Sequence, residues 1–249
     1  STGVDLWWDN VHSWKLDPVR IISNRINSET KGIYIAKHES ILKDNKVHSE
    51  ETGLEIGEYY DIGDDGYIHK LWNNEFTTGG MVLTHDNLDI RISKNNTLNG
   101  YPIIYFHKED VVQEDHIPEN AGQIILSHCN HSTIADLESG GSIYIHKSGY
   151  TMIENCTLRN GGFSIRSQIS NELEMRNTTI SNFTEGPYIS QGNFIGIDNE
   201  LEDLGGGLSL LGMDMIFIDG IDFINCSLWL GQNLDGHHID NCTVNGDPI

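Results

Sequence analysis

Histidine recurs at the end of one short sequence pattern. The pattern opens with glycine, runs through β-branched or large apolar residues and closes on histidine, most clearly in residues 80–85, 122–128 and 141–146. If such units stack along a coiled chain, the closing residues form one column: His85, His107, His128 and His146, with Arg166 in the same place on the next coil. Neighbouring imidazoles could then share a Cu or Zn ion, and His85, His107 and His128 are the candidate ligands.

The same column also has a catalytic interpretation. Enzymes that act on anionic polysaccharides need a base and a cation beside the sugar, and His128, His146 and Arg166 could supply them. However, a straight column holds ligands in a line rather than a tetrahedron, and no pair of carboxylates recurs beside it. A solvent-exposed row of side chains at a coil corner is therefore the alternative to both kinds of site.

Two acidic clusters lie in segments rich in turn residues. The clusters are Asp61, Asp64 and Asp65, and Asp198, Glu200, Glu202 and Asp203. Hard oxygen ligands in a Gly-rich turn suit Ca²⁺, although neither cluster has the spacing of a helix-loop-helix calcium site. Solvated acidic loops are the alternative, so Ca²⁺ is a candidate ion and no cofactor is required.

Four cysteines and seven glycosylation motifs accompany the repeat. Cys156, Cys226 and Cys242 each follow an asparagine in what reads as the same slot, whereas Cys129 stands elsewhere. A Cys226–Cys242 disulfide would fit adjacent rungs, but a ladder of buried thiols is the favoured interpretation. Seven asparagines begin Asn-X-Ser/Thr, and Asn95, Asn130 and Asn182 are the candidates for glycosylation, which would indicate an extracellular or cell-surface location.

One repeat of about 20 residues must position all of these side chains. Glycine-led strands alternate with a second signature in which apolar residues bracket a small or amide-bearing pair, as in residues 153–158. The apolar runs are short, alternate at period two and end at Gly, Asn or Asp, which excludes helical repeats. We therefore expect an all-β fold, a single-stranded right-handed parallel β-helix of about ten coils with irregular side loops, the longest over residues 184–206.

Stacking at about 4.8 Å per rung should align equivalent residues in ladders. Asn24, Asn45 and Asn74 share one slot, where their amides can hydrogen-bond to the backbone and to each other. Because the repeat spans the chain, residues 1–249 are expected to form one domain. Residues 243–249 (TVNGDPI) restate residues 97–103 (TLNGYPI). We therefore expect part of a longer repeat protein, or end rungs that pair with copies of the chain or with neighbouring β-helix repeats.

Charge limits the partners. The formal charge of the 249 residues is -22, which disfavours nucleic acid because phosphate binding needs a basic face. No apolar run is long enough to suggest a membrane span. Polysaccharide remains a candidate partner.

A family resemblance rests on three segments. Residues 99–106 (NGYPIIYF), 120–126 (NAGQIIL) and 239–244 (IDNCTV) resemble the NosD-type right-handed β-helix family, closely over residues 80–249 and loosely over 20–80. The resemblance implies the fold and an extracellular or surface setting, often archaeal. Members of that family resemble copper-delivery proteins, carbohydrate-binding or sugar-hydrolysing modules and surface-layer components.

The sequence thus predicts a non-catalytic extracellular β-helix module with a structural, cell-surface or glycan-binding role. The first alternative is a polysaccharide lyase or hydrolase that uses the His/Arg column, and the second is a NosD-like copper-binding protein. An open groove over His128, His146 and Arg166 would favour the enzyme.

Overall fold

The computed structural model shows an all-β parallel solenoid of about nine turns, which confirms the predicted fold class. It describes residues 3–6, 18–36, 39–57, 68–83, 89–93, 95–138, 141–231 and 236–249. The chain divides into two compact units, residues 1–103 and 104–249, and each unit is described by itself. The expectation of one domain stays a prediction.

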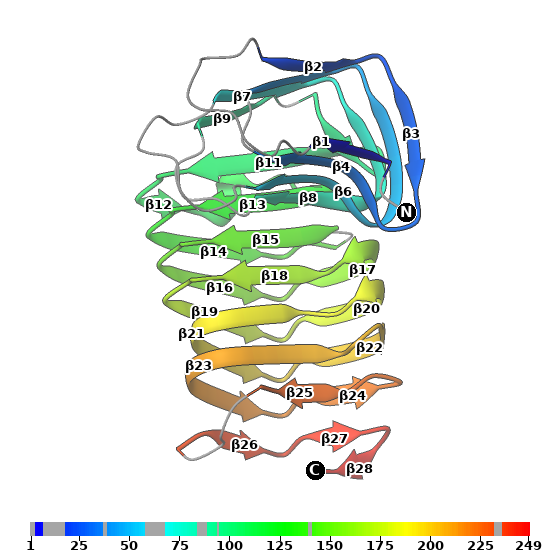
Figure 1. Cartoon of the computed structure of the whole chain (residues 1–249). Helices are drawn as coiled ribbons and strands as arrows, with labels where there is room; N and C mark the ends of the chain where they lie inside the picture. The colour runs from blue at the N-terminus through cyan, green and yellow to red at the C-terminus, as the bar shows by residue number, and fades with distance from the viewer. Residues whose placement is uncertain are drawn as a thin grey trace. The chain divides into compact units, whose positions relative to one another are not determined.

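Three sets of stacked strands build the first unit (Figure 1). One face contains β2 (Val19–Ile22), β5 (Ser40–Lys43), β7 (Ile68–Trp72) and β9 (Asp89–Ile92). A second face contains β3 (Arg25–Ser28), the first halves of β6 (Lys46–Gly57) and β8 (Glu75–Leu83), and β10 (Thr97–Leu98). β1 (Val4–Leu6) and β4 (Lys31–Ala36) form the third face with the second halves of β6 and β8.

Parallel pairing aligns the inward-facing residues of this unit in apolar files. Ile33, Leu54 and Met81 are partners on successive strands, and each is fully buried. Burying one such side chain contributes about 1.5–3 kcal/mol, and no single turn could bury its inner face alone. A file of glycines precedes these residues. A Cβ on Gly32 would lie 2.6 Å from the carbonyl oxygen of Gly53, so neighbouring rungs approach too closely for a side chain.

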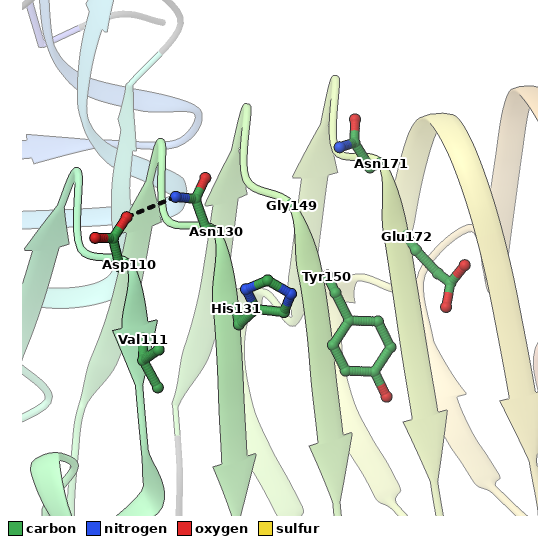
Figure 2. Close-up of a pocket in the computed structure, with 8 residues that line it drawn as sticks. All are labelled: Asp110, Val111, Asn130, His131, Gly149, Tyr150, Asn171 and Glu172. Carbon is green, nitrogen blue, oxygen red and sulfur yellow. Dashed lines mark hydrogen bonds between the residues drawn. The ribbon is translucent and has the colours of Figure 1, made fainter.

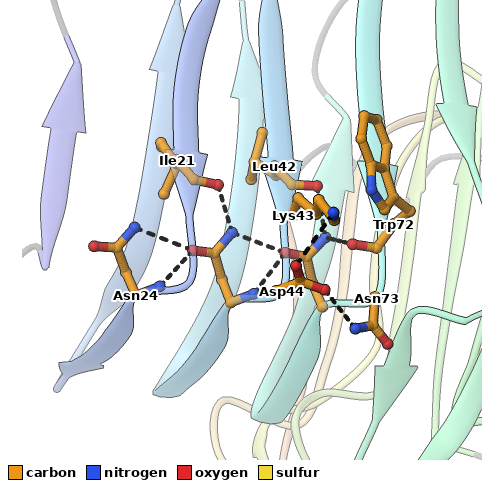
Figure 3. A network of polar contacts seen from close by, with 9 residues as sticks. Ile21, Asn24, Leu42, Lys43, Asp44, Trp72 and Asn73 are labelled. Carbon is orange, nitrogen blue, oxygen red and sulfur yellow. Dashed lines mark hydrogen bonds and ion pairs between the residues drawn. The ribbon is translucent and has the colours of Figure 1, made fainter.

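The expected asparagine ladder is present in the first unit (Figure 3), and Asn96 extends it by one member beyond those predicted. The Nδ2 of Asn24 donates to Oδ1 of Asn45 (3.2 Å), Asn45 donates to Asn74 (2.9 Å), and Asn74 donates to Asn96 (2.8 Å). Each Oδ1 also accepts the backbone N–H of the preceding asparagine. The three members after Asn24 are at most 1% exposed, so the ladder satisfies buried polar groups at one corner.

Three faces also build the second unit. The first face contains β11 (Tyr101–His107, which begins in the first unit), β13 (Gln123–Ser127), β15 (Ser142–His146), β18 (Ile165–Gln168), the starts of β21 (Tyr188–Ile197) and β23 (Leu208–Asp219), and β25 (Leu228–Leu230). The second face contains β12 (Val111–Val112), β14 (His131–Ala135), β16 (Tyr150–Glu154), β19 (Glu172–Arg176), the ends of β21 and β23, and β26 (His238–Asp240). The third face contains β17 (Thr157–Phe163), β20 (Thr179–Glu185), β22 (Glu200–Leu204), β24 (Asp222–Ile224), β27 (Thr243–Val244) and β28 (Asp247–Pro248).

Left-handed residues turn the chain at the corners of this unit. Between the first and second faces these are Lys108, His128, Lys147, Ile169, Gln191 and Gly212. Between the second and third faces, asparagine and aspartate dominate: Asp136, Asn155, Asn177, Asp198 and Asn241. They dominate again within or after the third face: Asn160, Asn182, Asp203, Asn225 and Asn245. Asparagine and aspartate tolerate a positive φ better than other residues with a side chain, which explains why they recur at one point of the repeat.

The repeated TxNGxPI segments form equivalent β-hairpins. β10 pairs antiparallel with β11 through Asn99-Gly100, and β27 pairs antiparallel with β28 through Asn245-Gly246. Both turn residues have positive φ in each hairpin, 53° and 84° in the first and 52° and 84° in the second, as a type I′ turn requires. In the first copy the chain continues along β11 into the second unit.

One predicted loop is wrong. Residues 184–206 are not irregular: they contain the end of β20, β21 and β22, and so form a regular turn of the solenoid. Gly186 and Gly205 lie at corners, where a carbonyl of a neighbouring rung leaves no room for a Cβ, whereas Gly196 lies within β21 against the side chain of Ile221. Helix is limited, in the described ranges, to one 3₁₀ turn, η1 (Glu114–His116). Within those ranges no helix has the length and apolar character needed to cross a membrane.

Candidate functional site

The structure brings three of the predicted histidines together. The ring centroids of His107 and His128 are 5.6 Å apart, and those of His128 and His146 are 5.8 Å apart. The Ser127 hydroxyl links the first two, at 3.3 Å from Nδ1 of His107 and 3.0 Å from Nδ1 of His128. His85 lies outside the described residues.

Strand register shows how this file is built. Ser127 and Gln168 are the register partners of His146, whereas His128 is the left-handed corner residue one position later, with φ of 58°. Arg166 pairs instead with Tyr144 and lies two positions before Gln168. Its guanidinium forms an ion pair with Glu185 and lies over the ring of Phe163. The structure therefore does not place Arg166 in the histidine file.

Burial limits what the file can reach. His146 is 2% exposed, and its ring stacks on that of Tyr144, which is fully buried and donates a hydrogen bond to Gln168. In the described part of the chain, no three His, Cys, Asp or Glu side chains gather as the ligands of a metal ion would. Asp61, Asp64 and Asp65 lie outside that part. In the second acidic cluster Asp198 and Asp203 occupy different corners, and Asp203 accepts a hydrogen bond from Asn225.

The cysteines are free thiols, and their predicted common slot needs a correction. Asn225 donates its backbone N–H to Asn245, whereas Asn241 donates its side-chain amide to Asp219. Cys226 therefore follows a different corner from Cys242, because two corners of the repeat use the same left-handed Asn followed by a small residue. Burial raises the pKa of all four thiols, that of Cys156 to about 11.

All seven sequon asparagines are exposed, including the candidates Asn95, Asn130 and Asn182. Five of the seven have a positive φ at a corner: Asn155, Asn177, Asn182, Asn225 and Asn241. The residue after each corner is buried or partly buried, and a threonine then begins or continues a strand, except after Asn225, where Ser227 lies just before β25. The density of these motifs thus follows from the corner architecture. Glycosylation itself stays a prediction.

An open groove lies on the outer side of the second face, whereas the histidine file lies on the first (Figure 2). It has a volume of about 630 Å³ and crosses β12, β14, β16 and β19. Its lining consists of Asp110, Val111, Asn130, His131, Gly149, Tyr150, Asn171 and Glu172. These are the second and third residues after each left-handed corner. Each rung therefore contributes two neighbouring residues, and strand pairing aligns them with the equivalent two residues of the next rung.

Hydrogen bonds hold two parts of the groove. At one end the Asn130 amide donates to Oδ1 of Asp110 at 2.8 Å. At the other end the Tyr150 hydroxyl donates to the carboxylate of Glu174, which also binds the guanidinium of Arg176. Burial, and then the contact with Glu174, raise the pKa of the Tyr150 phenol to about 12. The phenol therefore stays neutral and its ring is fixed at the groove surface.

The arrangement suits an extended polar ligand. It presents a tyrosine ring, an imidazole, two amides and two carboxylates along four stacked strands, without an enclosed cavity. Aromatic rings offer flat contact area, and amide and carboxylate groups offer directional hydrogen bonds. From the sequence, Asn130 was predicted only as a glycosylation site. A signal was present, because a polar or aromatic residue recurs just after the first corner of each coil.

No family model, curated protein or solved structure matches this chain. The fold is therefore a parallel β-solenoid on the strength of its own strand pairing. The NosD-type resemblance remains an expectation.

Proposed function

We propose that the chain is a non-catalytic, extracellular β-solenoid module that binds polysaccharide along the groove of the second face. The groove carries the proposal: His131 and Tyr150 are register partners on adjacent strands, and Asn130 and Asn171 each lie one position before the partnered residue of their own rung. A polymer that lies across the strands would meet a new pair of lining residues at each rung, at intervals of about 4.8 Å. Kinship with NosD-type surface proteins, suggested by residues 99–106 and 120–126, belongs to the same proposal.

The catalytic alternative has less support. The histidine file lies on the first face, where His146 and Tyr144 are almost inaccessible, and the described groove lies on the second. Arg166 is engaged by Glu185. A lyase or hydrolase would need its base and cation beside the polymer, and these side chains are not arranged that way.

The extracellular setting rests on two observations. Every sequon asparagine is exposed, so those outside the groove could carry a glycan without disturbing the core or the proposed binding site. Cys129, Cys156 and Cys242 are buried, and desolvation raises the pKa of the partly exposed Cys226 as well, which suppresses the thiolate that oxidants attack. Mass spectrometry of the protein from its native source would test this setting, since Asn95 or Asn182 should carry glycan there. Pairing of the end rungs with other copies stays a prediction.

Affinity electrophoresis through gels that contain individual soluble polysaccharides tests the binding function. At least one polysaccharide should retard the native chain, and His131→Ala should weaken that retention about ten-fold, or 1.4 kcal/mol. His116→Ala is the matched control, because His116 is also an exposed histidine but lies in η1, outside the groove. The proposal is wrong if no polysaccharide is retained, or if both variants bind like the native chain.

A further inference from the structure

The groove has a definite charge. Asp110 is exposed, and only one of its carboxylate oxygens takes the hydrogen bond from Asn130. Glu172 is half-buried beside Tyr150 on the neighbouring strand. Three strand steps separate the two carboxylates, which places them roughly 14 Å apart at opposite ends of the groove. They would therefore contact different sugar rings of one bound chain.

The lining of the groove contains no lysine or arginine. Lys108 and Lys147 occupy the corners before Asp110 and Tyr150 but are not part of the lining. The nearest arginine on the second face in the sequence, Arg176, directs its guanidinium to Glu174. Glu172 and Asp110 thus keep their charge available to a ligand.

The rest of the chain adds further negative charge to that of the groove. The formal charge is -22, and no lysine or arginine follows Arg176 in the sequence. A field of one sign attracts oppositely charged ligands and repels polymers that carry carboxylate or sulfate groups. Polyuronates and sulfated glycans are therefore disfavoured at this groove.

We infer that the groove, if it binds polysaccharide as proposed above, selects chains that carry free amino groups, with Asp110 and Glu172 as the two anchoring carboxylates. Protonated amines on separate sugars would pair with these carboxylates, and the rings between them would pack on His131 and Tyr150. Each exposed pair strengthens binding by up to about five-fold, so two pairs correspond to a preference of about ten-fold and at most about thirty-fold over the acetylated chain.

Calorimetric titration with three oligosaccharides of equal length tests this inference. The oligomers are glucosamine, N-acetylglucosamine and galacturonate, used at a mildly acidic pH where the amine is protonated. The glucosamine oligomer should bind about ten-fold more tightly than the acetylated one, and the galacturonate oligomer should bind least. Glu172→Gln should weaken glucosamine binding about three- to five-fold and weaken binding of the acetylated oligomer by less than that, so that the preference shrinks, and Asp110→Asn/Glu172→Gln should abolish the preference.

Glu200→Gln is the matched control, because it removes the same charge from an exposed position on the third face. If Glu200→Gln weakens glucosamine binding as much as Glu172→Gln does, attraction is diffuse and the inference fails. Equal binding of the amino and acetylated oligomers also overturns it, while the proposed polysaccharide function survives. If none of the polysaccharides used in the gels or in this titration binds, the proposed function itself fails.

Discussion

Tyr150 and Glu174 are joined across adjacent strands by a hydrogen bond from the phenol to a carboxylate that is only 5% exposed. Because Glu174 also holds Arg176, the tyrosine at the groove is fixed by a charged pair. The pKa of Tyr150 is raised to about 12, first by burial and then by Glu174. The ultraviolet titration curve of Tyr150→Phe, subtracted from that of the native chain, should leave the signal of one phenol that ionises near pH 12. In Glu174→Gln it should ionise closer to pH 10, and an unchanged midpoint would contradict this account.

His69 should make the first unit sensitive to acid. It is 2% exposed, its Nδ1 lies 2.8 Å from the Ser40 hydroxyl, and burial lowers its pKa from 6.5 to about 4. The unfolded chain takes up this proton near pH 6.5 and the folded chain only near pH 4. The contribution of a neutral His69 is therefore complete above pH 6.5 and is lost as the pH falls to 4, by about 3 kcal/mol in total.

The measurement for His69 is urea denaturation at several pH values between those limits. The double variant Ser40→Ala/His69→Leu has no titrating group at this position, so its free energy of unfolding should fall less than that of the native chain. If the free energy of unfolding falls equally with pH in the two proteins, His69 does not titrate as stated.

Asn74 should be the most sensitive member of the asparagine ladder. Its Oδ1 accepts two hydrogen bonds from Asn45, and its Nδ2 donates to Leu42 and Asn96. Asn74→Ala leaves several of these groups buried and unsatisfied, which should cost about 2–4 kcal/mol in urea denaturation. Asn24→Ala, at the exposed end of the ladder, should cost less than about 1 kcal/mol. Similar losses in the two variants would mean that the ladder does not stabilise by burial.

The thiols should react in the order of their exposure. Cys226 is partly exposed, whereas Cys156 is 2% exposed with its pKa raised to about 11. Short treatment of the folded protein with iodoacetamide, followed by peptide mapping, should therefore find Cys226 modified first and Cys156 last. In urea without reductant all four should react, because none is paired. Early modification of Cys156 would show that its corner opens more readily than its burial indicates.

The repeat unit could be predicted from sequence because its causes are local. Three signals can be recognised within one coil: asparagine at a left-handed corner, glycine where rungs touch, and alternating apolar residues in the strands. The ladder of Asn24, Asn45 and Asn74 was predictable for this reason. The two Asn-Cys corners looked alike for the same reason, and so Cys226 was aligned with Cys242.

The candidate site depends on how the strands of different coils are aligned, and the sequence of a single coil does not reveal this alignment. Gln168 rather than Arg166 continues the histidine file because β18 pairs with β15 in a register that sets Arg166 opposite Tyr144, two positions before the partner of His146. The groove arises only when the residues after four corners are stacked, and its members differ in type from rung to rung. Side chains that share no residue type give no motif, although their positions in the repeat are equivalent.

The two Asn-Gly hairpins have the same structure, so the second could connect the chain to a further unit as the first does. Thr97–Ile103 already passes the chain from one unit to the next, and Thr243–Ile249 has the same turn and the same strand pairing. A recombinant gene that repeats codons 104–249 after Ile249 should therefore produce an additional solenoid unit of the second kind. Such concatenation would multiply the number of grooves on one polypeptide, and binding strength could then be tuned by valency instead of by altering any contact.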